Sequence, residues 1–141
     1  MFTKELKWIN EVLCKIINIR FQNHGDYIGI RTAEFDVISG LSGVGNYLLD
    51  FADNQQINDT LIKICEYLVS EVILPYIPET IPKWKINMED EPLYKYYDDY
   101  EDGYINYTVS HGCGGVLLFL THAYEKGIKV DNHQSNRSYR E

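Results

Sequence analysis

The sequence has few basic residues: its 141 positions hold 13 Lys and Arg against 21 Asp and Glu, for a net charge of -8. A protein that binds nucleic acid gathers Lys and Arg on one face to neutralise phosphates. No basic stripe is present in this sequence. The composition therefore argues against a nucleic-acid partner. The negative net charge then indicates either an acidic surface that keeps the protein in solution or one that attracts a cationic partner.

The sequence also lacks long apolar runs and has little cysteine. Its apolar stretches are too short and too often interrupted to predict a transmembrane segment. The N-terminus, MFTKELKW, has no apolar core of the signal-peptide kind. Cys14, Cys65 and Cys113 are odd in number and far apart, which argues against a disulfide framework. These features predict a cytoplasmic protein with reduced thiols.

Four stretches have the periodicity of helices, and the first two differ in character. Residues 3–21 alternate charged and apolar groups, which predicts an amphipathic helix with one buried stripe. Residues 40–53 are apolar nearly all round, which predicts a helix buried on more than one side. Ser39 stands where a cap for this second helix is expected. The predicted stripe of the first helix consists of Leu6, Ile9, Leu13, Ile16 and Ile17.

The third and fourth helices are separated by a long connection. Residues 56–74 have the clearest periodicity, and Pro75 ends them. Residues 112–126 predict a helix with Gly127 near its C-terminal cap. The acidic, tyrosine-rich connection, residues 76–110, could contact a peptide or pack its tyrosines onto the helices. The predicted apolar face of the third helix consists of Ile57, Leu61, Ile64, Cys65, Leu68 and Val72.

A glycine motif opens both the second and the fourth helix. Gly40-Leu-Ser-Gly43-Val and Gly112-Cys-Gly-Gly115-Val stand 72 residues apart, and each precedes an apolar run. Glycine costs a helix about 1 kcal/mol relative to alanine, so these glycines predict a close approach of neighbouring backbone. The free N–H groups of both first turns would then point into a shared space. Amphipathic and buried helices alternate, which predicts concentric rings with the buried helices inside.

The residues around both motifs resemble one known family. Residues 34–49, EFDVISGLSGVGNYLL, are similar to the DVI-x-GLSG segment of LanC-type lanthionine synthetases. Residues 103–116, GYINYTVSHGCGGV, are similar to the G-x-x-N-x-x-x-x-HG-x-x-G segment of that family. Pro82-Lys-Trp84 stands where the family often has a short Pro/Trp element. The resemblance covers roughly residues 8–131 and indicates an internal fragment of the family.

The resemblance implies an all-α fold and a reaction. The fold would be a partial α/α toroid, with about four helices of a double ring over residues 1–130. Residues 131–141 are polar and lack periodicity, so we expect a disordered tail there. The reaction would add a cysteine thiol of a lantibiotic precursor peptide to dehydroalanine or dehydrobutyrine, forming a thioether ring. A zinc ion would activate the thiol, while His111 and Asp36 would handle protons. The implied partners are the precursor peptide and a dehydratase or transporter of the same pathway.

The sequence departs from the family in its metal ligands. The family's zinc is held by a Cys in a Trp-Cys-Tyr-Gly segment and by an adjacent Cys-His pair, all downstream of the His-Gly motif. This sequence contains neither Trp-Cys nor Cys-His. We therefore expect a truncated chain without metal ligands that is inactive alone. The alternatives are a non-catalytic helical module that binds peptides, and a product that does not fold stably.

The candidate residues also have simpler explanations. His111 could be a loop or capping histidine, although the family pattern favours acid–base chemistry. Asp36 could be a carboxylate that the dipole of a nearby helix favours. Cys113 forms a His-x-Cys pair with His111, but two ligands are too few for a structural zinc site. Packing is the favoured role for Cys113, since free cysteine is often buried.

Overall fold

The computed structural model describes residues 3–22, 31–73, 84–86 and 103–130, and this part of the chain is helical. Extended pairing among these residues is limited to an isolated antiparallel bridge between Ile86 and Tyr104. The predicted all-α class is thereby confirmed. No helix within the described ranges is long and apolar enough to cross a membrane. The predicted tail at 131–141 and most of the tyrosine-rich connection lie outside the described residues.

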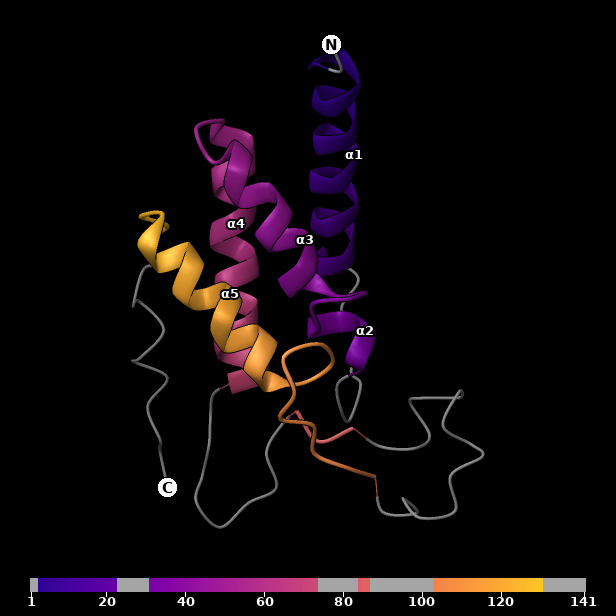
Figure 1. Ribbon diagram of the computed structural model, residues 1–141. Helices are drawn as coiled ribbons and strands as arrows, with labels where there is room; N and C mark the ends of the chain where they lie inside the picture. Colours follow the sequence, from indigo (N-terminus) through magenta and orange to yellow (C-terminus); the bar gives the residue numbers. More distant parts are fainter. Residues whose placement is uncertain (1–2, 23–30, 74–83, 87–102, 131–141) are drawn as a thin grey trace, which may run out of the picture.

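All four predicted helices are present (Figure 1). Together with the turns that extend them, the four helical segments begin and end within two residues of the predicted positions. A short helix at 32–35 was not predicted. The elements are α1 (Thr3–Gln22), α2 (Thr32–Phe35), α3 (Leu41–Leu48), the 3-10 turn η1 (Leu49–Phe51), α4 (Gln55–Tyr67), the π-helical turn η2 (Leu68–Ile73) and α5 (Cys113–Glu125).

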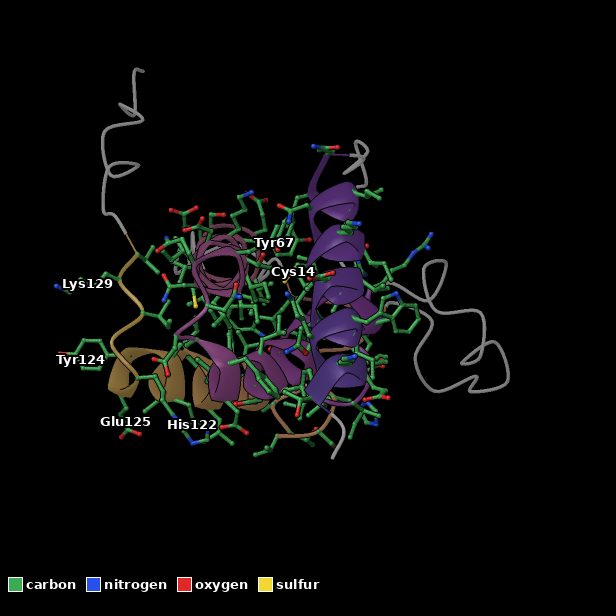
Figure 2. The ribbon with its side chains drawn as sticks, turned by 90° about the horizontal axis from the view of Figure 1, so that it is seen from above. Cys14, Tyr67, His122, Tyr124, Glu125 and Lys129 are labelled. Atoms are coloured by element: carbon green, nitrogen blue, oxygen red, sulfur yellow. The ribbon has the colours of Figure 1, made fainter. Side chains whose placement is uncertain are left out.

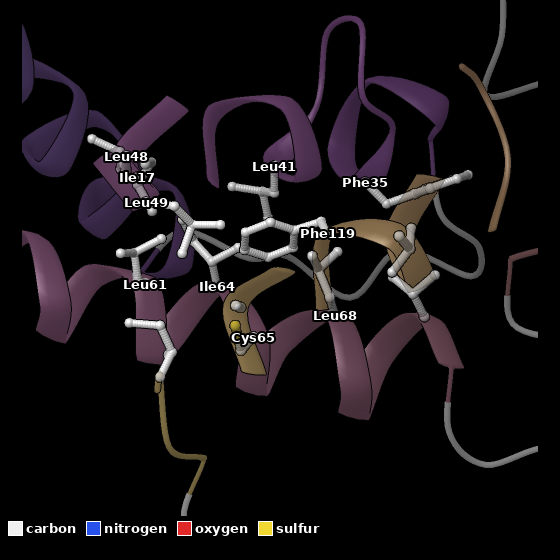
Figure 3. Packing of buried hydrophobic residues seen from close by; sticks show 14 of the residues in the cluster. Ile17, Phe35, Leu41, Leu48, Leu49, Leu61, Ile64, Cys65, Leu68 and Phe119 are labelled. Atoms are coloured by element: carbon white, nitrogen blue, oxygen red, sulfur yellow. The ribbon is translucent and has the colours of Figure 1, made fainter. Parts of the chain in front are cut away.

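The core is built around α4 and η2, whose predicted apolar face is confirmed. Every residue of that face, from Ile57 to Val72, is buried. Phe119 of α5 and Leu41 of α3 join the same cluster (Figure 3). Full burial of such a side chain contributes about 1.5–3 kcal/mol, so this cluster supplies most of the apolar stabilisation. The Asn54 side chain accepts from the Ile57 N–H and caps the start of α4.

Helices α3 and α5 pack against each other in parallel. Gly45 lies against the Phe119 ring, so this pair of helices makes close contact at mid-length. Three residues further along α5 and at the next residue of α3, His122 Nδ1 lies 3.2 Å from Asn46 Oδ1. Because the contacts advance together along both helices, the two N-termini lie at the same end, beside α2 (Figure 1).

The glycine motifs make the predicted close backbone approach. A Cβ at Gly43 would overlap the carbonyl oxygen of Val37, and one at Gly115 would overlap that of Val109. Val37 and Val109 are themselves 72 residues apart, so both motifs seat their preceding loop in the same way. The N-cap glycines also share an extended backbone, with φ of -108° and -131°. The sequence repeat is therefore a structural repeat of a loop folded onto a helix start.

The predicted buried stripe of α1 is only partly confirmed: Ile17 is buried and Leu13 packs partly buried against the core, whereas the other three residues are exposed. Ile16 is 56% exposed, and the buried residues of this helix are Asn10, Cys14 and Ile17. Cys14 lies on the side of α1 that faces α4 (Figure 2). Asn10 can occupy this face because the Tyr47 hydroxyl donates to its Oδ1 at 2.9 Å, which satisfies a buried polar group. Periodicity could not reveal that partner, which comes from α3.

We expect Gly115→Ala to destabilise the fold by about 2 kcal/mol. Alanine would gain about 1 kcal/mol of helix propensity, but its Cβ would meet a backbone carbonyl that cannot rotate away. Urea unfolding followed by circular dichroism measures the change. Thr121→Ala, at an exposed position of the same helix, is the matched control and should stay within about 0.5 kcal/mol of the parent. Equal midpoints for Gly115→Ala and the parent would contradict the close approach.

Candidate functional site

Two loops, each leading into a glycine-started helix, meet at the shared end of α3 and α5. The first loop begins at Asp36, whose N–H donates to the Thr32 carbonyl and closes α2. The Ser42 hydroxyl donates to the Phe35 carbonyl, and the Gly43 N–H donates to the Asp36 carbonyl at 3.2 Å. The start of α3 thus holds the backbone on both sides of the Asp36 side chain.

The second loop is ordered by Asn106 and Thr108. The Asn106 carbonyl accepts from the Cys113 N–H at 3.0 Å, and its side-chain oxygen accepts from the Thr108 N–H at 2.9 Å. Thr108 Oγ1 in turn accepts from the His111 N–H at 3.3 Å. A backbone bond from the Val37 N–H to the Ser110 carbonyl, 3.2 Å long, joins this loop to the first.

Asp36 and His111 form a close pair where the loops meet. His111 Nδ1 lies 2.7 Å from Asp36 Oδ2. The Asp36 side chain is fully buried, while 43% of the His111 side chain is exposed. A carboxylate in a buried site is costly unless its oxygens accept hydrogen bonds. The other oxygen, Oδ1, accepts from the N–H of Ser39 at 2.7 Å and from its hydroxyl at 3.0 Å.

The arrangement fixes which ring nitrogen of His111 is available. A carboxylate only accepts, so Nδ1 carries the hydrogen that Asp36 binds. In the neutral ring, Nε2 then has a free lone pair. Because Asp36 is buried and His111 is half-exposed, a substrate reaches the imidazole and not the carboxylate. Chemically, the pair can take up and return a proton at Nε2.

Ser39 does not cap α3, contrary to expectation. Gly40 is the N-cap residue and makes no side-chain bond, while the Ser39 hydroxyl turns back to Asp36. From the sequence, Asn106 was identified only as a residue of the family motif, and Thr108 was given no role. The 72-residue repeat could have pointed to Ser39 and Thr108, since Ser39 is at the repeat position equivalent to His111 and Thr108 is at the one equivalent to Asp36.

The described residues do not fit a zinc ion. No three His, Cys, Asp or Glu side chains come together in the described ranges. Cys113 follows His111 closely but is buried, and desolvation raises the pKa of its thiol. Its role as a packing residue agrees with this burial, and Asp36 and His111 are already bound to each other. No step of the chemistry is therefore assigned to a metal on these residues.

A groove runs between α1 and α3 beside the first loop. Its volume is about 550 Å³, and Ser39 and Gly40 form part of its wall. The residue that binds Asp36 is therefore part of the groove wall. The apolar residues of its wall are Leu6, Ile9, Leu13, Val37, Ile38 and Val44.

Comparison with known proteins gives one family. The family model described as "Lanthionine synthetase C-like protein" matches residues 3–136, which is nearly the whole chain. No curated protein matches the chain. The match spans both glycine motifs, Asp36 and His111.

We expect all three cysteines to be unreactive in the folded chain. Cys14, Cys65 and Cys113 are buried. Burial, with a smaller effect of Glu66, raises the pKa of Cys65 to about 12, so at pH 8 this group stays a protonated thiol. Labelling with N-ethylmaleimide at pH 8 should be at least roughly a hundredfold slower than for the urea-unfolded chain, because it requires opening of the fold. Rapid native labelling of any of the three would contradict their burial.

Proposed function

The chain belongs to the lanthionine synthetase C-like family, and from this membership we propose that its Asp36–His111 pair moves protons during thioether ring formation in a peptide. The substrate class is a peptide that contains a cysteine and a dehydroalanine or dehydrobutyrine. Lantibiotic precursor peptides have this chemistry. The observation that carries the proposal is the 2.7 Å bond between an exposed imidazole and a buried carboxylate.

The proposed step is a conjugate addition within one peptide. His111 Nε2 accepts the thiol proton as the sulfur bonds to Cβ of the dehydro residue, and the former C=C electron pair moves into an enolate. The imidazolium then returns a proton to Cα, which completes the addition with no net change in atoms. Asp36 stabilises the imidazolium and holds the ring in orientation. Such proton transfer typically contributes a factor of 10² to 10⁴ in rate.

The groove between α1 and α3 supports a peptide substrate. Its apolar wall would hold side chains of an extended segment, while its edge at Ser39 lies next to the Asp36–His111 pair. Binding there would bring a neighbouring thiol and dehydro residue to one place. Holding both reacting groups together lowers the entropic part of the barrier.

A non-catalytic peptide-binding module is the second candidate. The groove favours it, because a surface of this kind can bind a peptide without any chemistry. This candidate predicts that the peptide binds while its thiol and dehydro residue both persist.

The pathway and location belong to the same proposal. We propose a cytoplasmic setting, in which the three cysteines stay reduced. A dehydratase that supplies the dehydro residue, or a transporter that exports the product, would be the partners. The family's zinc would have to be held by residues other than those described.

The proposal predicts that His111→Gln and Asp36→Asn each slow ring formation by roughly a hundredfold. Glutamine cannot take the proton, and asparagine would donate to Nδ1 and place the hydrogen on Nε2. Ring formation leaves the peptide mass unchanged, so its rate is measured as loss of the peptide's N-ethylmaleimide-reactive thiol by mass spectrometry. The full chain is compared with peptide alone, which reports uncatalysed closure.

His122→Gln is the matched control, since His122 points away from the core on α5 (Figure 2). It should cyclise the peptide at the parent rate. Binding by the parent chain without thiol loss would favour the peptide-binding module. Equal rates for the parent and His111→Gln would refute the proton-transfer role.

A further inference from the structure

We propose that Ser39 is a positioning residue that holds the Asp36 carboxylate in the orientation that fixes the tautomer of His111. This inference rests on the function proposed above. Ser39 touches neither the substrate nor the imidazole in this role. It acts through Asp36 alone.

The first support is that the two carboxylate oxygens of Asp36 have different partners. Oδ2 faces His111 Nδ1, while Oδ1 accepts both hydrogen bonds from Ser39. The torsion of a carboxylate about its Cβ–Cγ bond is otherwise broad, and intermediate rotations would turn both oxygens away from the ring. Two donors from one residue, at 2.7 and 3.0 Å, oppose that rotation. They keep Oδ2 aimed at the ring.

The second support is the structural repeat. Ser39 and His111 stand 72 residues apart, as do the N-cap residues Gly40 and Gly112 that follow them. Each loop therefore sends the side chain at the same position to the same carboxylate, one to each oxygen. Asp36 is clamped between equivalent positions of two loops. A hydroxyl that only capped α3 would not make this contact.

The third support is that the Ser39 hydroxyl binds Asp36 although water is available to it as another partner. Ser39 is an exposed residue, so water could satisfy its hydroxyl at no cost to folding. It nevertheless turns toward a fully buried carboxylate. Hydrogen bonds to a charged acceptor are stronger than those between neutral groups, which accounts for the choice.

The test uses the full chain and three variants. Ser39→Ala removes the hydroxyl but keeps the N–H bond, and Ser39→Thr restores a hydroxyl. Ser110→Ala is the matched control, because within the described residues the Ser110 hydroxyl contacts Thr108 and not the carboxylate. The tautomer of neutral His111 is read from its ring ¹⁵N chemical shifts, and ring formation is read from peptide thiol loss.

We expect Ser39→Ala to lower the ratio of the Nδ1–H to the Nε2–H form by roughly three- to tenfold, as one lost hydrogen bond implies. Ring formation should slow by a similar factor in a chain that still unfolds cooperatively above the assay temperature. Ser39→Thr and Ser110→Ala should keep the parent ratio. A ratio unchanged in Ser39→Ala would overturn the proposal, as would a loss in Ser110→Ala as large as that in Ser39→Ala.

The two readouts separate this proposal from the proposed function. If the parent chain forms no ring, the proposed function fails, while the tautomer ratio still decides the role of Ser39. If Ser39→Ala does not fold, Ser39→Thr and Ser39→Cys provide the test: a parent-like ratio in the first and a lowered ratio in the second would support the proposal. Equal ratios in these two variants would overturn it.

Discussion

The close seating of two loops on two helix starts is the constraint on which the rest of the site depends. At Gly43 and Gly115 the backbone of the preceding loop occupies the space that a side chain would fill. Only this approach lets the Val37 N–H reach the Ser110 carbonyl and so join the loops. The Asp36–His111 bond follows from that junction, because neither residue belongs to a helix that could position it alone.

The site is placed at the edge of a well-packed scaffold. The apolar face of α4 anchors α3 and α5 in parallel, so both helix starts open at the same end. Burial of apolar groups is non-directional and cannot select a histidine tautomer. The hydrogen bonds of Ser39, Asn106 and Thr108 hold the two loops and the Asp36 carboxylate in place. The structure thus separates stability, which comes from the core, from orientation, which comes from polar contacts within the loops.

Asp36 and His111 differ in their exposure to solvent. Asp36 is buried, and both of its carboxylate oxygens accept hydrogen bonds. His111 is half-exposed and presents its second nitrogen outward. A buried carboxylate that bonds an exposed imidazole is an arrangement suited to proton transfer.

The helices and the buried face of α4 could be predicted from the sequence, because both follow from the local spacing of apolar residues, and the two glycine motifs are visible in it directly. Ile57, Leu61 and Leu68 are buried as their periodicity predicts. The family resemblance singled out Asp36 and His111. Only the tertiary structure decided which side of α1 is buried, because Asn10 is satisfied by a hydroxyl from α3. Only the structure showed that Ser39 binds Asp36 instead of capping α3, since a serine's partner depends on which acceptor the folded chain brings within reach.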